Sequence, residues 1–483
     1  SAVWHLEYSV AGLEARTDRF YTLRFRARSD APRQIVCRFG QADAPYRSLG
    51  LRINVAIDKT WREHRFEFQP PQAESNARVS FLFAQSAAPF EIADVELVSQ
   101  PIAGLRDGES LVKATVALLA TGESQARLLD RLRFLAETEK RYYDDFRKFL
   151  KDDLGCKALV TGTMVNGPLG LWAQSDMDYL DTHAYWSHPS FPKGWNRKNW
   201  SMDQKAMTDL PRNNVLSQVA ACRLAGKPLT LSEYNHPAPN DAQAECVPMV
   251  AAMAAAQDWD GVWLFAFTDR GEGWDAGAFD GWFDFAGNPS KWGFVPLGAA
   301  IFRDGGIEPL PKGKVYPLAA SPDPLGELAA LHFRHDHSLL GALAEVGKAS
   351  AESAWRERMY VSLAGPAPAP RGGADSATAI AWADGRFEAA GRGGRVVIDT
   401  AGDGTSSLRT DRAAFAVLAA AAMDAQALPQ SRKVLFALCG RCENTGMEFS
   451  ADRRTVSDRW GTAPVRIERV SAEFDWPAAP GRT

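Results

Sequence analysis

The stretch Leu229-Thr-Leu-Ser-Glu-Tyr-Asn-His236 decides how the middle of this chain folds. Mostly apolar positions lead directly into the carboxylate of Glu233, and three polar side chains and Pro237 follow it. A buried strand with a polar end is typical of a parallel sheet, in which the carboxyl ends of the strands line the substrate cleft. We therefore expect Glu233 to sit on a rigid element facing a cleft, as a carboxylate nucleophile must. An ion-paired or capping glutamate is the alternative.

The segments around this stretch alternate between strand and helix patterns. Buried-strand runs cover residues 157–163, 177–186, 228–235 and 261–268, and helical spacing covers residues 128–150, 213–224, 242–257 and 294–302. Because the links between them are short, the alternation predicts a parallel sheet. Right-handed crossovers would wind such a sheet into a barrel or an open sheet.

A second polar strand end lies upstream, in Asp178-Tyr-Leu-Asp-Thr-His-Ala-Tyr-Trp-Ser-His188. Alternation places Asp181, His183 and Tyr185 on one face of that strand. We expect His183 and Tyr185 to point toward the cleft of Glu233, where each could donate a hydrogen bond to a carboxylate or a sugar hydroxyl.

The same segment raises a metal-dependent hydrolase as an alternative, and its ligands would be Asp178, Asp181, His183 and His188. Their spacing matches no closed zinc motif, so no metal site and no cofactor is predicted.

Tryptophan is unusually frequent in the middle region. Nine of the 15 tryptophans lie between Trp172 and Trp292, where an even spread over 483 residues would place about four. Indole faces suit the apolar faces of sugar rings, and indole N–H groups suit sugar hydroxyls. Core packing accounts for about half of them. The strand beginning near Trp263 runs on to Asp269 and Glu272, which are candidates for a second carboxylate.

Composition limits the function classes. The 483 residues suggest about three domains. The net charge of −4 argues against a broadly basic nucleic-acid-binding protein. The longest apolar run, residues 413–423, is too short to cross a bilayer, and no signal-peptide pattern opens the chain. Six cysteines, including a lone Cys439-x-x-Cys442, are expected to be small buried thiols, with a local disulfide as the alternative.

The sequence patterns on either side of the middle region predict β-rich domains. Short, partly alternating runs over residues 21–28, 34–39, 51–57, 64–69, 78–83 and 92–98 predict an all-β sandwich. Strand-like pieces at residues 377–383, 395–399, 433–439 and 465–470 predict a second β domain, while residues 413–421 fit either helix or buried strand. We expect domains at residues 1–104, 105–306 and 307–483.

Residues 128–303 resemble the second half of a clan A (β/α)8 glycoside hydrolase, close to the cellulase and mannanase type of family 5. Glu233 in Ser-Glu-Tyr-Asn matches the nucleophile that ends strand seven of that clan, and His183-Ala-Tyr185 matches a His-x-Tyr that ends strand six. Residues 158–163 would be strand five, and residues 261–267 would be strand eight.

The flanking regions carry resemblances of their own. Tyr21-Thr-Leu-Arg-Phe-Arg-Ala-Arg28, Trp61 before Phe66-Glu-Phe68, and Ile92-Ala-Asp-Val-Glu-Leu97 resemble a family 4/9-type carbohydrate-binding module, which is a jelly roll. Glu443-Asn-Thr-Gly-Met447 and Trp460-Gly-Thr-Ala-Pro464 resemble the β-sandwich that trails such barrels. The resemblances imply a multidomain α/β plus all-β protein: a TIM-barrel portion with strands five to eight, flanked by an N-terminal jelly roll and a C-terminal β-sandwich.

The implied activity is retaining hydrolysis of a β-linked glycan of the cellulose or mannan type. The implied site has Glu233 as nucleophile and eight binding residues: His183, Tyr185, Trp186, Tyr234, Asn235, His236, Trp263 and Trp274. Polymer-degrading relatives are usually exported, so a secreted or periplasmic location is expected. An oligo- or polysaccharide is the expected partner, with no nucleic acid and no membrane.

Two departures from the clan pattern matter. The clan carries its acid/base on an Asn-Glu pair, and this sequence contains no Asn-Glu dipeptide. Nor do residues before 128 show barrel strands one to four. A partner segment or second chain could supply those strands. Alternatively, the chain is a non-catalytic carbohydrate-binding protein or half of a split enzyme without its own acid/base.

Overall fold

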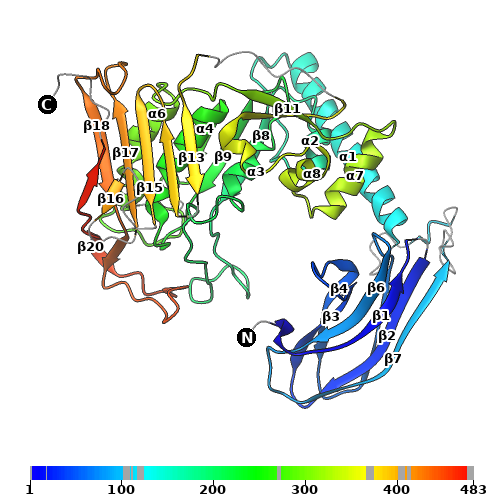
Figure 1. The fold of residues 1–483 in the computed structure, drawn as a ribbon. Helices are drawn as coiled ribbons and strands as arrows, with labels where there is room; N and C mark the ends of the chain where they lie inside the picture. Colours follow the sequence, from blue (N-terminus) through cyan, green and yellow to red (C-terminus); the bar gives the residue numbers. More distant parts are fainter. Residues whose placement is uncertain are drawn as a thin grey trace. The chain divides into compact units, whose positions relative to one another are not determined.

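The computed structural model describes residues 3–17, 19–101, 109, 113–116, 124–268, 273–365, 375–383, 385–400, 408–410 and 415–475. The chain divides into two compact units, Ser1–Leu135 and Ala136–Thr483 (Figure 1). The helix α1 (Gln125–Lys148), predicted over residues 128–150, contains the division. The three domains expected from the sequence stay a prediction.

The N-terminal unit holds two antiparallel sheets. One has the order β1-β6-β3-β4, with β1 (Glu7–Ala15), β6 (Glu74–Leu82), β3 (Arg33–Gln41) and β4 (Ser48–Ile57). The other has the order β5-β2-β7, with β5 (Arg62–Phe68), β2 (Arg19–Ser29) and β7 (Phe90–Pro101). All six strands predicted in this region are confirmed. β1 was not predicted from the sequence, and a short 3-10 turn (Val3–His5) precedes it.

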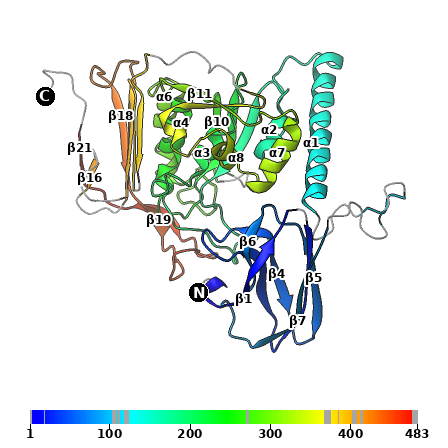
Figure 2. The ribbon, with the colours of Figure 1, turned by 45° about the vertical axis from the view of Figure 1, so that its right-hand side comes forward.

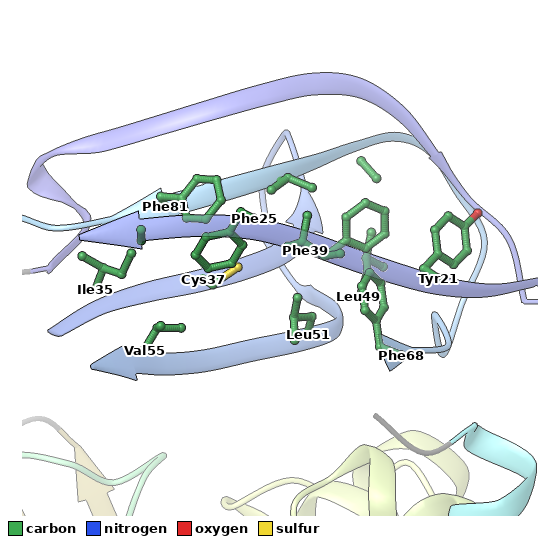
Figure 3. Close-up of a cluster of buried hydrophobic side chains, with 14 of the residues drawn as sticks. Tyr21, Phe25, Ile35, Cys37, Phe39, Leu49, Leu51, Val55, Phe68 and Phe81 are labelled. Atoms are coloured by element: carbon green, nitrogen blue, oxygen red, sulfur yellow. The ribbon is translucent and has the colours of Figure 1, made fainter. Parts of the chain in front are cut away.

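The core of this unit lies between its two sheets. Figure 3 shows Phe25, Cys37, Phe39 and Phe81 directed into it, and all four are fully buried. Each of the three phenylalanine rings contributes on the order of 1.5–3 kcal/mol by leaving water. Because successive side chains on a strand alternate between faces, the residues between these core positions project from the opposite face of the sheet.

A three-stranded parallel sheet forms the centre of the second unit. Its order is β10-β9-β8, with β10 (Gly261–Leu264), β9 (Leu229–Asn235) and β8 (Leu180–Tyr185). The helices α3 (Val215–Ala220) and α4 (Cys246–Gln257) lie between these strands in sequence, which confirms the predicted alternation. The Asn214 side chain caps α3 by accepting the backbone N–H of Ser217 at 2.8 Å.

The predicted fifth barrel strand, residues 158–163, is wrong. Only an isolated parallel bridge joins this segment's end to β8, between Met164 and Asp181. The Asp178 carboxylate accepts the N–H of Val160 at 2.9 Å, and the Thr161 hydroxyl donates to the carbonyl of Tyr179 at 2.9 Å. These side-chain bonds replace part of a strand ladder. A TIM barrel is not shown, and among the described residues β10 pairs with β9 alone.

A five-stranded antiparallel sheet follows, in the order β13-β14-β15-β17-β18. Its strands are β13 (Ala379–Ala383), β14 (Arg386–Ala390), β15 (Gly394–Asp399), β17 (Ala416–Ala422) and β18 (Val434–Cys439). Figure 2 shows α4 and α6 (Val295–Phe302) between this sheet and the parallel one. The alanine-rich run left open by the sequence forms β17, and its paired, buried position explains why small apolar residues suffice there.

The remaining elements are short. They are the helices α2 (Gly167–Ala173), α5 (Pro289–Trp292), α7 (Pro324–Arg334), α8 (Leu339–Val346) and α9 (Ser353–Arg356), a π turn (Phe149–Asp153), a 3-10 turn (Gln243–Glu245), and the strand pairs β11 (Gly313–Pro317) with β12 (Arg358–Ser362), β16 (Leu408–Thr410) with β21 (Ala472–Phe474), and β19 (Cys442–Thr445) with β20 (Thr462–Ile467). Among the described residues, none of the helices combines the length and apolar character that crossing a bilayer requires.

Candidate functional site

A bulge in β9 determines where the Glu233 side chain lies. On the β8 side, Thr182 pairs with Leu231 but His183 pairs with Glu233, so Ser232 is an extra residue. The pairing with β10 shows the same register shift. A bulge interrupts the alternation of side chains and commonly re-aims one of them beside an active site. Here Ser232 and Glu233 are both half-buried, whereas Leu231 before them is buried.

Two side chains from the end of β8 contact the Glu233 carboxylate. The Tyr185 hydroxyl donates a hydrogen bond to Oε2 at 2.6 Å, and His183 Nδ1 lies 3.4 Å from the same oxygen. The Glu233 side chain is 35% exposed. Among the described residues, no lysine or arginine forms an ion pair with it. The carboxylate is thus neither fully buried nor ion-paired with a lysine or arginine among the described residues.

Behind this contact, a chain of hydrogen bonds orients the His183 ring. The Ser232 hydroxyl donates its only proton to Asp181 Oδ2 at 2.6 Å. Ser232 Oγ therefore acts as the acceptor for His183 Nε2, which lies 3.1 Å away, and the neutral ring carries its proton on Nε2. Nδ1 then has a proton to offer Glu233 only when the ring is charged.

Tyr185 is held as a hydrogen-bond donor. Its ring packs against Phe283 and Phe265, with ring centroids 5.3 and 6.2 Å away. Burial, the hydrogen bond to Glu233 and the charge of that carboxylate all raise the pKa of Tyr185 above its usual value. The phenol therefore stays protonated across the neutral range, where it can orient the carboxylate.

Three residues predicted to bind sugar are instead fully buried: Tyr234, Asn235 and His236. The Tyr234 hydroxyl lies 2.6 Å from His236 Nε2, and the Asn235 amide donates to the carbonyl of Phe283 at 2.6 Å. Their polar groups are used internally, which corrects the expectation that they line the cleft. Trp186 is also buried, and its indole N–H donates to the carbonyl of Lys205 at 2.8 Å.

Buried ionisable side chains that were not predicted from the sequence surround these residues. Lys291 Nζ donates to Asn235 Oδ1 at 2.8 Å, and His236 Nδ1 lies 3.5 Å from Glu245 Oε1. Burial raises the pKa of Glu245 to about 8 and lowers the pKa of Lys291 to about 8. Burial likewise holds the pKa of His236 well below its ordinary value. No sequence motif marks Lys291, because its burial depends entirely on tertiary packing.

The remaining predicted tryptophans are exposed. Trp263 is 56% exposed and lies along β10 over Gly261, where a Cβ atom would meet its indole at 2.5 Å. Trp274 lines an open pocket of about 370 Å³ together with Phe267 and Trp292. The Phe267 ring stacks on Trp274 at a centroid distance of 5.0 Å. Glu233 is not among the residues lining that pocket.

The metal-dependent alternative gains no support from the described part of the chain. Arg147 and Lys151 form ion pairs with Asp178 at 2.5 and 2.9 Å. Burial opposes ionisation of Asp178, but hydrogen bonds from these cations and from Val160 N–H outweigh it and lower its pKa. No group of three or more histidine, cysteine or carboxylate side chains able to hold a metal was found among the described residues. Asp269 and Glu272 lie outside them.

No family model matches the sequence, and no curated protein matches it. Solved structures of carbohydrate-binding modules are similar to the N-terminal fifth of the chain. A structure titled "CBM4 structure and function" is 22% identical with a TM-score of 0.20, over 21% of this chain and 64% of that one.

Two further structures are comparable. The N-terminal cellulose-binding domain of Cellulomonas fimi β-1,4-glucanase C is 22% identical with a TM-score of 0.17, over 20% of this chain and 70% of that one. A family 16 carbohydrate-binding module-2 is 13% identical with a TM-score of 0.16, over 19% and 70%. The chain thus spans about two thirds of each module's length. At these TM-scores the likeness carries no argument about function.

Proposed function

We propose that this chain is a retaining glycoside hydrolase of the clan A lineage, acting on a β-linked glycan of the cellulose or mannan type, with Glu233 as nucleophile. The observation that carries the proposal is the hydrogen bond of 2.6 Å from Tyr185 to Glu233 across the ends of two parallel strands. Strand ends on this side of a parallel sheet are where such folds bind substrates. We extend the proposal to a secreted or periplasmic location, where such polymers are found.

The contacts give the two carboxylate oxygens of Glu233 different roles. Tyr185 and His183 both approach Oε2, which leaves Oε1 to attack the anomeric carbon. The bond from that carbon to the leaving oxygen breaks as the glycosyl-enzyme bond forms, and a partner acid protonates the leaving oxygen. The same partner, now a base, removes a proton from the water that releases the sugar. In retaining enzymes the two carboxyl groups are about 5–5.5 Å apart.

A second candidate function is carbohydrate binding without hydrolysis, or half of a split enzyme. The open edge of the parallel sheet favours it: among the described residues β10 pairs only with β9, and Trp263 on that strand is 56% exposed. An unpaired strand edge invites pairing with another segment. A partner segment or second chain carrying barrel strands one to four would cover this edge and could bring the missing acid.

The test separates the nucleophile from the partner acid. A 2,4-dinitrophenyl β-cellobioside or β-mannobioside has a leaving group that needs no proton from the protein. The release of dinitrophenol in the first step therefore reports Glu233 even where the acid is absent. We expect the wild-type chain to release dinitrophenol and Glu233→Gln to slow that release at least about 100-fold, since the covalent step is removed.

The matched control is Glu448→Gln, because Glu448 is an exposed acid of the same unit, ion-paired with Arg459 at 3.0 Å. It should leave the rate of dinitrophenol release unchanged. Full turnover by Glu233→Gln would remove Glu233 from the mechanism. Glycan affinity without dinitrophenol release by the wild-type chain would favour the non-catalytic candidate.

A further inference from the structure

The outward face of one N-terminal sheet gathers three arginines, Arg38, Arg52 and Arg78, which we call the arginine face. Figure 3 shows Cys37, Phe39 and Leu51 directed into the core, so the positions between them on β3 and β4 project from the opposite side of the sheet. Arg38 on β3 stands directly opposite Arg52 on β4. Arg78 on β6 stands opposite Gly40, two residues along β3 from Arg38.

This arrangement places like charges together. Two cations directly opposite each other on neighbouring strands destabilise a sheet. Glu7 forms an ion pair with Arg78 at 2.8 Å and also accepts a hydrogen bond from Ser80 at 3.0 Å. Arg52 is exposed and has no carboxylate partner among the described residues. Glu74, on the same face of β6, accepts a hydrogen bond from Gln41 at 2.8 Å. Arg38 and Arg52 therefore have no carboxylate partner among the described residues, and unpaired charges of this kind are expected where a protein binds a ligand.

The guanidinium group of Arg38 is held in place beside Arg52. Arg38 is only 6% exposed, and its Nη2 donates to the backbone carbonyls of Tyr46 and Arg47. Its side chain lies across Gly40, where a Cβ atom would be 2.5 Å from Nη2. The Nε atoms of Arg38 and Arg78 are buried without a hydrogen-bond partner. Burial, and after it the charges of Arg78 and Arg52, lower the pKa of Arg38.

An exposed aromatic ring completes the surface. Tyr46 is 53% exposed, and the guanidinium of Arg78 lies 5.5 Å from its ring centroid. An aromatic face of this kind can receive the apolar face of a sugar ring, while arginine pairs with a carboxylate through two parallel hydrogen bonds. A neutral glycan would use the ring but would leave the surplus charge without a partner.

We propose that the arginine face binds an acidic glycan, in which a uronic acid carboxylate pairs with Arg52 and a sugar ring lies on Tyr46. The choice of a glycan among polyanions rests on the function proposed for Glu233. The site itself belongs to the N-terminal unit and differs from the Glu233 site in both position and charge. It gives the chain a higher affinity for carboxylated polymers than for the neutral β-linked glycans named above.

Titration calorimetry on the full chain tests the proposal with two matched probes. These are a β-1,4-linked mannuronate hexasaccharide and β-1,4-linked mannohexaose, which differ in whether C6 is a carboxylate or a hydroxymethyl carbon. In a Glu233→Gln background, which prevents turnover, we expect Arg52→Gln to weaken binding of the mannuronate probe about tenfold, the loss expected for one charged hydrogen bond. Arg52→Lys should recover part of that loss, and rising salt should weaken the binding.

The control is Arg65→Gln, because Arg65 is an exposed arginine of the other sheet and is ion-paired with Glu67. It should leave mannuronate binding unchanged, and Arg52→Gln should leave mannohexaose binding unchanged. Absence of mannuronate binding, or binding that Arg52→Gln does not weaken, would overturn the proposal. So would equally tight, Arg52-dependent binding of single-stranded DNA or polyphosphate. Dinitrophenol release by the wild-type chain reports the Glu233 proposal separately, so either idea can fail alone.

Discussion

The hydroxyl of Tyr185 donates a hydrogen bond of 2.6 Å to Glu233 Oε2, and this contact depends on a single extra residue in β9. Without Ser232 as the bulged residue, the register that pairs Thr182 with Leu231 would continue and place position 232 beside His183. A slip of one residue turns a side chain to the other face of a sheet. Because of the bulge, Glu233 rather than Ser232 pairs with His183.

Replacing Tyr185 by phenylalanine should separate the role of this hydrogen bond from packing. The ring stays in place against Phe283, but Glu233 loses a donor to its charged carboxylate. A hydrogen bond to a charged group is worth about 1.5–3 kcal/mol, so the first-step release of dinitrophenol from the dinitrophenyl glycoside should slow by about 10- to 100-fold.

The control for this variant is Tyr316→Phe. Tyr316 also donates its hydroxyl to a carboxylate, that of Glu357, and is largely buried in the same unit. It should leave the rate of dinitrophenol release unchanged, while both variants should lower the melting temperature only slightly. Equal rates of release for Tyr185→Phe and the wild type would show that the contact does not orient a nucleophile.

Cysteine labelling tests the oxidation state that the fold implies. All six cysteines are free, and five are buried; Cys156 is the half-buried exception. Burial raises the pKa of Cys439 to about 12 and that of Cys442 to about 11, so neither forms a reactive thiolate near neutral pH. With iodoacetamide at pH 8 and no reductant, we expect mass spectrometry to find Cys156 labelled first. All six should react after denaturation in urea.

Cys37 serves as the internal control, because it is fully buried in the other unit and far in sequence from any second cysteine. It should be protected in the native chain and labelled after denaturation. If Cys439 and Cys442 stayed unlabelled in urea until a reductant was added, the two thiols would form a disulfide, and their free state would be refuted.

The sequence predicted those elements whose local pattern and tertiary environment agree. Residues 228–235 and 242–257 became β9 and α4 because apolar side chains are needed on both sides of a covered parallel strand and all round a buried helix. Ala416–Ala422 could not be assigned from its pattern, since alanine suits a helix and is buried equally well in a strand. Its pairing with β15 and β18 decided the outcome.

The candidate site was predictable only in part. Position at a strand end singled out Glu233, His183 and Tyr185, and these three side chains meet in the structure. The same reasoning predicted that Tyr234 lines a cleft, but its side chain is fully buried. A bulge changes which residues share a face, and no pattern of apolar and polar residues marks where one occurs. The burial of Lys291 likewise depends on segments distant in sequence.

Lys291 yields a pH-dependent prediction for stability. It is fully buried, and burial lowers the pKa of its amine to about 8. The folded pKa lies below the unfolded value near 10.5, so the folded state releases its proton first as pH rises. The free energy of unfolding should therefore rise with pH between about 8 and 10.5, and this contribution should be lost as pH falls through 8.

Lys291→Met removes this titration while keeping a long apolar side chain. Below pH 8 the variant should be more stable than the wild type, because it no longer buries a charge. Its advantage should then shrink by about 3 kcal/mol between pH 8 and 10.5, which follows from a shift of 10.5 to about 8. Urea unfolding followed by tryptophan fluorescence at pH 8, 9 and 10 measures the difference. Lys198→Met, at a lysine 75% exposed, should show a difference that is flat with pH. A flat difference for Lys291→Met as well would mean that the amine is charged and solvated in the folded chain.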